Sequence, residues 1–150
     1  MLRQRFEPEL AMLRSRPARE FLTDPGTALA AVLLFDQLPR NLYRGDRRAF
    51  AFDALARDIA KGALDRAWDS ALSQAQRQFL AMPLMHSEAI ADQRRSLAIY
   101  ARLGRRYGWP FAVSHYRMIA RFGRFPHRNA ILGRKSSTAE TRAVAAGFAW

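Results

Sequence analysis

The fold class is decided at residues 24–38, which read DPGTALAAVLLFDQL. Asp24 and Pro25 mark a helix start, because an aspartate at the N-cap accepts backbone N–H bonds and a proline at the first helical position has none to donate. The apolar residues that follow recur without the period-two alternation of a strand, which is typical of a buried helix. The next residue is proline, which disfavours helical geometry at Leu38. We therefore expect the helix to end at Leu38 and residues 39–45 to form a turn.

Apolar residues recur at spacings of three and four through almost the whole chain, and no segment alternates long enough to suggest a strand. Capping-box pairs at Ser73 and Gln76, and at Ser137 and Glu140, predict two further helix starts. The sequence therefore predicts an all-α fold with at least six helices joined by short loops. Such helices form either a bundle or a stack of antiparallel hairpins, and periodicity alone does not choose between them.

Size and composition favour one globular domain over residues 1–150. A chain of 150 residues, 49% hydrophobic and 25% charged, is long enough to bury one core. The longest purely apolar run, Ala28 to Phe35, is far shorter than the ~20 residues that cross a bilayer. We therefore expect no membrane segment and a cytoplasmic location. The absence of cysteine excludes disulfides, thiol nucleophiles and cysteine zinc sites.

The formal net charge of +12 permits an electrostatic association with nucleic acid. Of the 25 basic residues only Lys61 and Lys135 are lysines, and the arginines are spread along the chain without a basic block. Weak, non-specific nucleic-acid binding is therefore an alternative function that we do not favour.

Three segments carry dense polar groups at predicted helix ends or breaks: residues 36–45, 83–88 and 121–129. Helix ends expose backbone groups and are common places for ligand contacts. The candidate ligand-binding residues in these segments are Asp36, Gln37, Arg40, Asn41, His86, Glu88, Arg124, His127, Arg128 and Asn129. Because alternate helix ends return to the same edge of an antiparallel stack, we expect Asp36, Arg40, His86 and Arg128 to share one polar cluster.

These polar groups have two interpretations that are compatible with each other. They can form a buried hydrogen-bond network that fastens helix ends. Alternatively, Arg40, Arg124 and Arg128 can converge with the neighbouring His and Asn side chains on an anion, since the guanidinium fork pairs with carboxylate or phosphate. The second interpretation makes the protein a binding module for a small anionic ligand or the carboxylate of a peptide or protein partner.

An enzyme is the alternative from another functional class. His86, Glu88 and His127 are the residue types of a hydrolase site, and they could also ligate zinc or iron. Their spacing does not require a metal, however, and we predict neither a metal nor a cofactor. Ser87 follows His86 without a nucleophile-elbow motif, so we interpret it as the cap of a helix that extends to Leu103. His115 is expected at the edge of the core.

The longest of these motifs reads RFGRFPHRNAILGR at residues 121–134. Together with the two earlier polar segments, in this order, it resembles the bacterial family of uncharacterised function numbered 924 among the domains of unknown function. The resemblance runs from about Phe6 to the end of the sequence. It implies an all-helical fold similar to tetratricopeptide repeats, so we expect stacked antiparallel helical hairpins, and it implies no established activity. The chain departs from the family pattern at Leu38, where Phe is usual, at Ala89, where an acidic residue is usual, and in a tryptophan-containing N-terminal stretch, which is missing.

Overall fold

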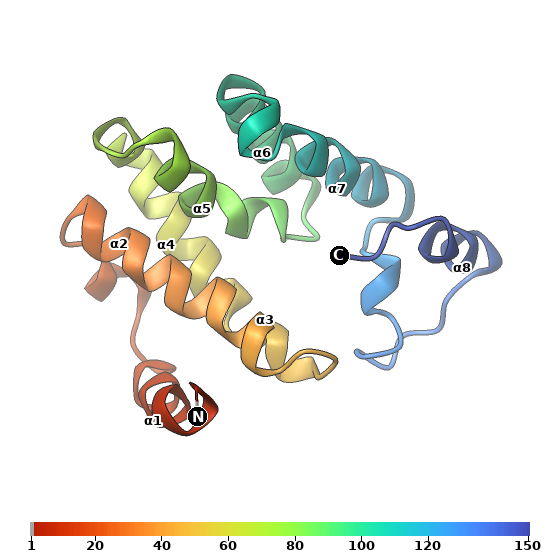
Figure 1. Ribbon diagram of the computed structural model, residues 1–150, viewed down its shortest axis with the longest axis horizontal. Coiled ribbons are helices and arrows are strands. Elements are labelled where there is room, and N and C mark those ends of the chain that lie inside the picture. Colours follow the sequence, from red (N-terminus) through yellow and green to blue (C-terminus); the bar gives the residue numbers. More distant parts are fainter. Residues whose placement is uncertain (1) are drawn as a thin grey trace. The chain divides into compact units, whose positions relative to one another are not determined.

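The computed structural model describes residues 2–150, and its regular structure is helical throughout that range, with no strand (Figure 1). This confirms the prediction of an all-α fold with at least six helices. The chain divides into two compact units, one ending at Pro83 and the other comprising Leu84–Trp150. No helix within residues 2–150 combines the length and apolarity needed to cross a membrane.

The first unit is built around the pairing of α2 with α4. Its helices are α1 (Leu2–Leu13), α2 (Pro25–Val32), α3 (Leu38–Leu42), α4 (Asp53–Asp65) and most of α5 (Gln74–Met85). Helix α2 begins as expected, because the Asp24 side chain accepts the Thr27 N–H. The buried core includes Val32 at the end of α2, Phe35 from the helical turn that follows α2, and Ile59 from α4. Apolar burial along these helices is the main stabilising contribution in this unit.

The prediction that the helix ends at Leu38 was wrong. Leu38 has helical angles, φ −64° and ψ −45°, and the chain stays helical through Pro39 to the end of α3. The connecting segment Leu33–Gln37 is a π-helical turn in which the Leu38 N–H reaches back five residues to the Leu33 carbonyl. Proline clashes with the carbonyl four residues before it in an ordinary α-helix, and a wider turn relieves that clash. The π-helical turn therefore allows Leu38 to keep helical angles, although a residue before proline usually avoids them.

The second unit contains α6 (Ile90–Leu103), α7 (Trp109–Phe122) and α8 (Thr138–Ala145). Helices α6 and α7 are joined by a short loop and pack side by side as a hairpin (Figure 1). Helix α7 ends at Gly123, whose φ of 69° is the left-handed conformation of a helix C-cap. Residues 123–137 then form the loop that leads to α8. This loop carries most of the polar groups considered below.

Helix termini agree with the sequence in some places and differ in others. Both capping boxes are present: Ser73 with Gln76 before α5, and Ser137 with Glu140 at α8. Ser87 does not cap α6, which begins after Ala89, and its hydroxyl instead accepts the Ala89 N–H and donates to Asp92. The expected cap was wrong, because α6 begins at Ile90 and its N-cap residue is Ala89.

Candidate functional site

The first-unit candidates centre on Arg40. Its guanidinium donates in bidentate fashion to the Asp53 carboxylate, with N–O distances of 2.8 and 2.9 Å. The same group donates to the Asp36 carbonyl and lies 3.2 Å from the Asp36 carboxylate, which is fully buried. Although burial opposes it, the negative charges of Asp36 and Asp53 raise the pKa of Arg40. Arg40 therefore ties the π-helical turn to the start of α4.

Gln37 and Asn41 complete this group of predicted residues. The Gln37 amide donates to the Asp36 carboxylate, and Asn41 donates to the Gln37 carbonyl at 3.1 Å. Asn41 is exposed, whereas Gln37 is partly buried. The structure thus joins all four first-unit candidates and adds Asp53, which lies 13 residues after Arg40 and carries no motif signal.

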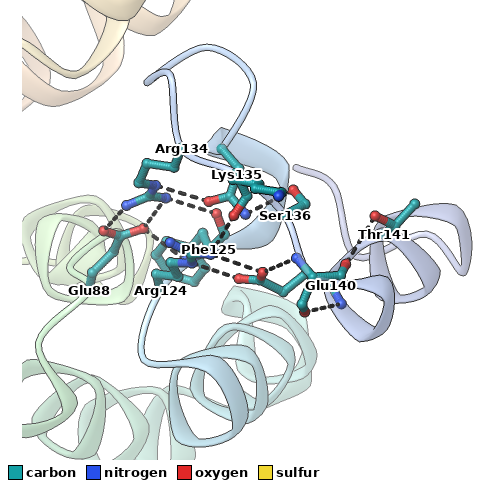
Figure 2. Close-up of polar contacts among 10 residues, drawn as sticks. Glu88, Arg124, Phe125, Arg134, Lys135, Ser136, Glu140 and Thr141 are labelled. Carbon is teal, nitrogen blue, oxygen red and sulfur yellow. Dashed lines mark hydrogen bonds and ion pairs between the residues drawn. The ribbon is translucent and has the colours of Figure 1, made fainter.

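In the second unit, Glu88 is held by the 123–137 loop (Figure 2). Its carboxylate accepts two bonds from the Arg134 guanidinium, at 2.8 and 2.9 Å, and the Phe125 N–H at 2.8 Å. Burial opposes ionisation, but the hydrogen bonds from Arg134 and Phe125 lower the pKa of Glu88 below its usual value. Both oxygens of this carboxylate are occupied by hydrogen bonds within the chain.

Arg134 also organises the loop itself. Its guanidinium donates to the Asn129 side-chain oxygen at 2.9 Å and to the Phe125 carbonyl at 3.1 Å. The fully buried Asn129 in turn donates to the Ser136 hydroxyl at 3.0 Å. Arg134 was absent from the candidates, although it ends the long motif. Its partners lie up to 46 residues away, so spacing alone could not identify them.

Arg124 fastens the same loop to α8 (Figure 2). It donates to both oxygens of the buried Glu140, at 2.6 and 2.9 Å, and to the Lys135 carbonyl at 2.9 Å. The Ser137 N–H is a further donor to Glu140 at 2.7 Å. The hydrogen bond from Arg124, followed by that from Ser137, holds the pKa of Glu140 far below its usual range. The capping box was the sequence signal that pointed to Glu140.

All three histidines of the chain lie in a second group, which we call the imidazole cluster and define as His86, His115, His127, Phe125 and Trp150. The His115 ring stacks on Trp150 with a centroid distance of 3.9 Å and lies 6.1 Å from His86. The His127 ring meets Trp150 edge-on at 5.5 Å. Three imidazoles from the α5–α6 connection, from α7 and from the 126–128 turn are thereby brought together.

The surroundings of His115 and His127 disfavour protonation of these two imidazoles. Burial, followed by the charges of His86 and Arg128, lowers the pKa of His115 to about 3. Burial, followed by the charge of Arg128, lowers the pKa of His127 to about 4. The His115 Nδ1 atom lies 2.7 Å from the Phe111 carbonyl, which fixes a proton on that nitrogen. Both imidazoles are therefore neutral at pH 7.

The strongest signs of a binding site are at His127, a member of this cluster, and at the neighbouring residue Arg128. The Nδ1 atom of His127 is buried and has no hydrogen-bond partner within residues 2–150. Next to it, the Arg128 guanidinium donates to the His86 carbonyl at 3.0 Å and lies over the Phe125 ring, 4.6 Å from its centroid. Arg128 is only 7% exposed. Perturbed titratable groups beside a buried cation are a recognised feature of functional sites.

The predicted residues therefore form one group in the first unit and two groups in the second, the loop network and the imidazole cluster. Asp36, Gln37, Arg40 and Asn41 belong to the first unit, and the remaining candidates belong to the second. A single cluster containing both Arg40 and Arg128 stays a prediction. Within residues 2–150, no set of three His, Asp or Glu side chains is arranged to hold a metal ion.

The comparisons with known proteins agree with this architecture. The family model of the bacterial protein of unknown function DUF924 matches residues 1–147. A solved structure, the protein of unknown function ATU0120 from Agrobacterium tumefaciens, is similar with a TM-score of 0.87 and 37% sequence identity. The match covers 97% of this chain and 82% of that one. The comparison with curated proteins yields no match. The chain belongs to the bacterial DUF924 family.

Proposed function

We propose that this protein is a binding module for a small oxyanion, such as a carboxylate or phosphate, held beside Arg128 and His127 in the imidazole cluster. The observation that carries the proposal is the buried Nδ1 of His127, which has no hydrogen-bond partner within residues 2–150 and whose ring is close enough to the buried Arg128 guanidinium for that charge to lower its pKa. An unsatisfied buried polar atom costs free energy, and a bound ligand that pairs with it removes that cost.

The electrostatics of the cluster support an anion as the ligand. The positive charge of Arg128 contributes to lowering the pKa of both His115 and His127, and at His127 the charge of Glu88 offsets part of this effect. A negative charge placed there is attracted by Arg128, and neutral imidazole N–H groups can donate to it. The fully buried Phe125 supplies an apolar wall, beside which such attraction is stronger than in water, whereas Trp150 is 40% exposed.

Anion binding at this position is coupled to protons. A bound negative charge favours the imidazolium form and therefore raises the pKa of His127 from about 4. The complex then takes up protons that the free protein does not bind, so affinity increases as the pH falls toward the raised pKa of His127 in the complex. A simple surface patch of arginines would not show this dependence.

The hydrolase alternative receives less support from the contacts of Glu88. A general base must have a free oxygen near the reacting proton. Both Glu88 oxygens accept hydrogen bonds from Arg134, and one also accepts the Phe125 N–H. His86 and His127 could still act as a general acid or base, but the Glu88 carboxylate holds the 123–137 loop in place through its hydrogen bonds to Arg134 and Phe125.

Thermal unfolding with added oxyanions tests the proposal. Phosphate, sulfate and succinate are each compared with sodium chloride at equal ionic strength, so that general screening is removed. At ten times its dissociation constant a ligand adds about 1.4 kcal/mol of stability, which raises the Tm of a chain of this size by roughly 3–5 °C. We expect such a rise for the parent protein and for Arg94→Gln, which removes an exposed charge on α6.

His127→Gln should fold and lose the oxyanion-dependent rise, because glutamine cannot supply the same buried nitrogen. Equal Tm values in oxyanion and chloride for the parent protein would overturn the proposal. An undiminished rise in His127→Gln would place the anion elsewhere and overturn it as well.

A further inference from the structure

A cavity of about 260 Å³ lies within the second unit, between α7 and α8. None of the candidate residues from the sequence lines it, and none of the imidazole cluster does. Its walls are formed by Met118 and Arg121 from α7, Ala139, Arg142 and Ala143 from α8, and Phe148. The cavity is therefore separate from the proposed oxyanion site.

The base of this cavity is apolar. Met118 and Ala143 are buried members of the core cluster of this unit, and Phe148 packs against that cluster while remaining partly exposed. Ala139 adds another small apolar surface. A hydrocarbon group placed on this surface would be removed from water, which is favourable in proportion to the apolar area covered.

The charged groups of the lining are all cationic. Arg121 and Arg142 are both exposed, and within residues 2–150 neither forms an ion pair with a carboxylate. The Arg121 guanidinium lies over the neighbouring Phe122 ring, 4.9 Å from its centroid. By contrast, the nearby Glu140 is occupied by Arg124. The cavity thus combines an apolar base with two guanidinium groups and no acid.

We infer that this cavity is a second binding site, whose ligand is a small amphipathic carboxylic acid. Its carboxylate pairs with Arg121 and Arg142, because the planar guanidinium fork matches a carboxylate. Its hydrocarbon part lies on Met118, Ala143 and Phe148. This inference is independent of the proposed oxyanion site, since the two share no residue.

The cavity is open to solvent on one side, and its volume indicates the size of the part of a ligand that fits inside. A water molecule occupies about 30 Å³ of the liquid, so a cavity of about 260 Å³ holds a molecule of roughly eight to ten non-hydrogen atoms. Hexanoate meets this limit and combines the two required features. Acetate lacks the hydrocarbon part, and hexanamide lacks the charge.

Isothermal titration of the full chain with hexanoate, acetate and hexanamide tests each feature separately. We expect hexanoate to bind with a measurable Kd and to bind at least 10-fold more tightly than either control compound, a ratio of about 1.4 kcal/mol. Hexanoate that does not bind, or that binds no better than acetate and hexanamide, would overturn the inference.

Variants then locate the site. Arg121→Gln and Arg142→Gln should each weaken hexanoate binding by about 10-fold, because each removes a charged hydrogen bond. Arg117→Gln removes an exposed arginine from the same helix outside the cavity and should leave the Kd within about 2-fold. Equal weakening by all three variants would mean general electrostatic attraction and would contradict the site.

A fourth variant addresses the cavity without a change of charge. Ala139→Leu adds bulk to the wall of the cavity in the first turn of α8 and should abolish hexanoate binding. Unchanged binding in Ala139→Leu would overturn the proposed location. His127→Gln should bind hexanoate normally, which separates the outcome here from that of the oxyanion proposal.

Discussion

Arg134 is the residue on which the second-unit network depends most. It donates to Glu88, Asn129 and the Phe125 carbonyl, and these acceptors have few other partners. One guanidinium therefore joins the loop to the segment before α6 and also holds the loop in its own conformation. A side chain that satisfies three separate acceptors is costly to remove.

We therefore expect Arg134→Ala to lower the free energy of unfolding by about 2–3 kcal/mol, because a carboxylate and a buried amide oxygen lose their donor. Urea denaturation followed by circular dichroism measures this change. Lys135→Ala is the matched control: its side chain is exposed, and the expected loss is below about 0.5 kcal/mol. Similar losses in the two variants would show that the network contributes little.

His115 makes stability dependent on pH. Its pKa is about 3 in the folded protein, against 6.5 for the exposed group. Below pH 6.5 the unfolded chain takes up a proton that the folded protein does not, so stability is complete above that pH and is lost as the pH falls. The loss from this one group between pH 6.5 and 4.5 is about 2 kcal/mol. His115→Gln should show a smaller decrease in urea midpoint over this range, and a decrease equal to that of the parent would count against the buried neutral imidazole.

At the scale of the elements, helix α8 depends on its capping box. The Ser137 hydroxyl accepts the Glu140 N–H, while the Glu140 carboxylate accepts the Ser137 N–H. Ser137→Ala should lower stability by about 1 kcal/mol, which corresponds to a Tm lower by roughly 2–4 °C. Thr138→Ala, one residue further along and without a cap bond, should change the Tm by less than half of that. A thermal melt that fails to separate the two variants would contradict the capping role.

The helix starts that could be predicted are those with local signals. Each of these caps is formed by residues within one turn of each other, so both partners can be recognised in a short stretch of sequence. Examples are Asp24 with Pro25 and Ser137 with Glu140. The passage of the helix through Pro39 could not be predicted in this way. It depends on a π-helical turn whose buried Asp36 is neutralised by Arg40, and Arg40 is held by Asp53 of α4. Tertiary contacts there override the local preference.

For the candidate site, the sequence likewise identified residues within local polar segments but did not identify their distant partners. Polar segments identified Glu88, Arg124 and Asn129, and the structure places them in one network. The partners Arg134 and Asp53 were missed because their significance depends on contacts 46 and 13 residues apart. His115 was expected at the edge of the core, and its stacking on Trp150 depends on tertiary structure that periodicity does not contain.

At the scale of the whole molecule, the net charge of +12 attracts any anion to the protein surface. This general attraction is screened by salt, with a Debye length of about 8 Å at physiological ionic strength. A buried site is screened much less. Tests of the oxyanion site therefore have to be made at matched ionic strength, where surface binding to the many arginines is the same in both samples.

The titration of His127 with and without an oxyanion shows whether an anion binds in the imidazole cluster. The chain has three histidines, so their imidazole resonances can be assigned with three His→Gln variants and followed by NMR from pH 8 to 4.5. In sodium chloride we predict that His127 stays mostly neutral over this range, with about a quarter protonated at pH 4.5, in keeping with its pKa of about 4. In sulfate at equal ionic strength its pKa should rise by at least about one unit, because the bound anion favours imidazolium. An identical titration of His127 in the two salts would contradict the account.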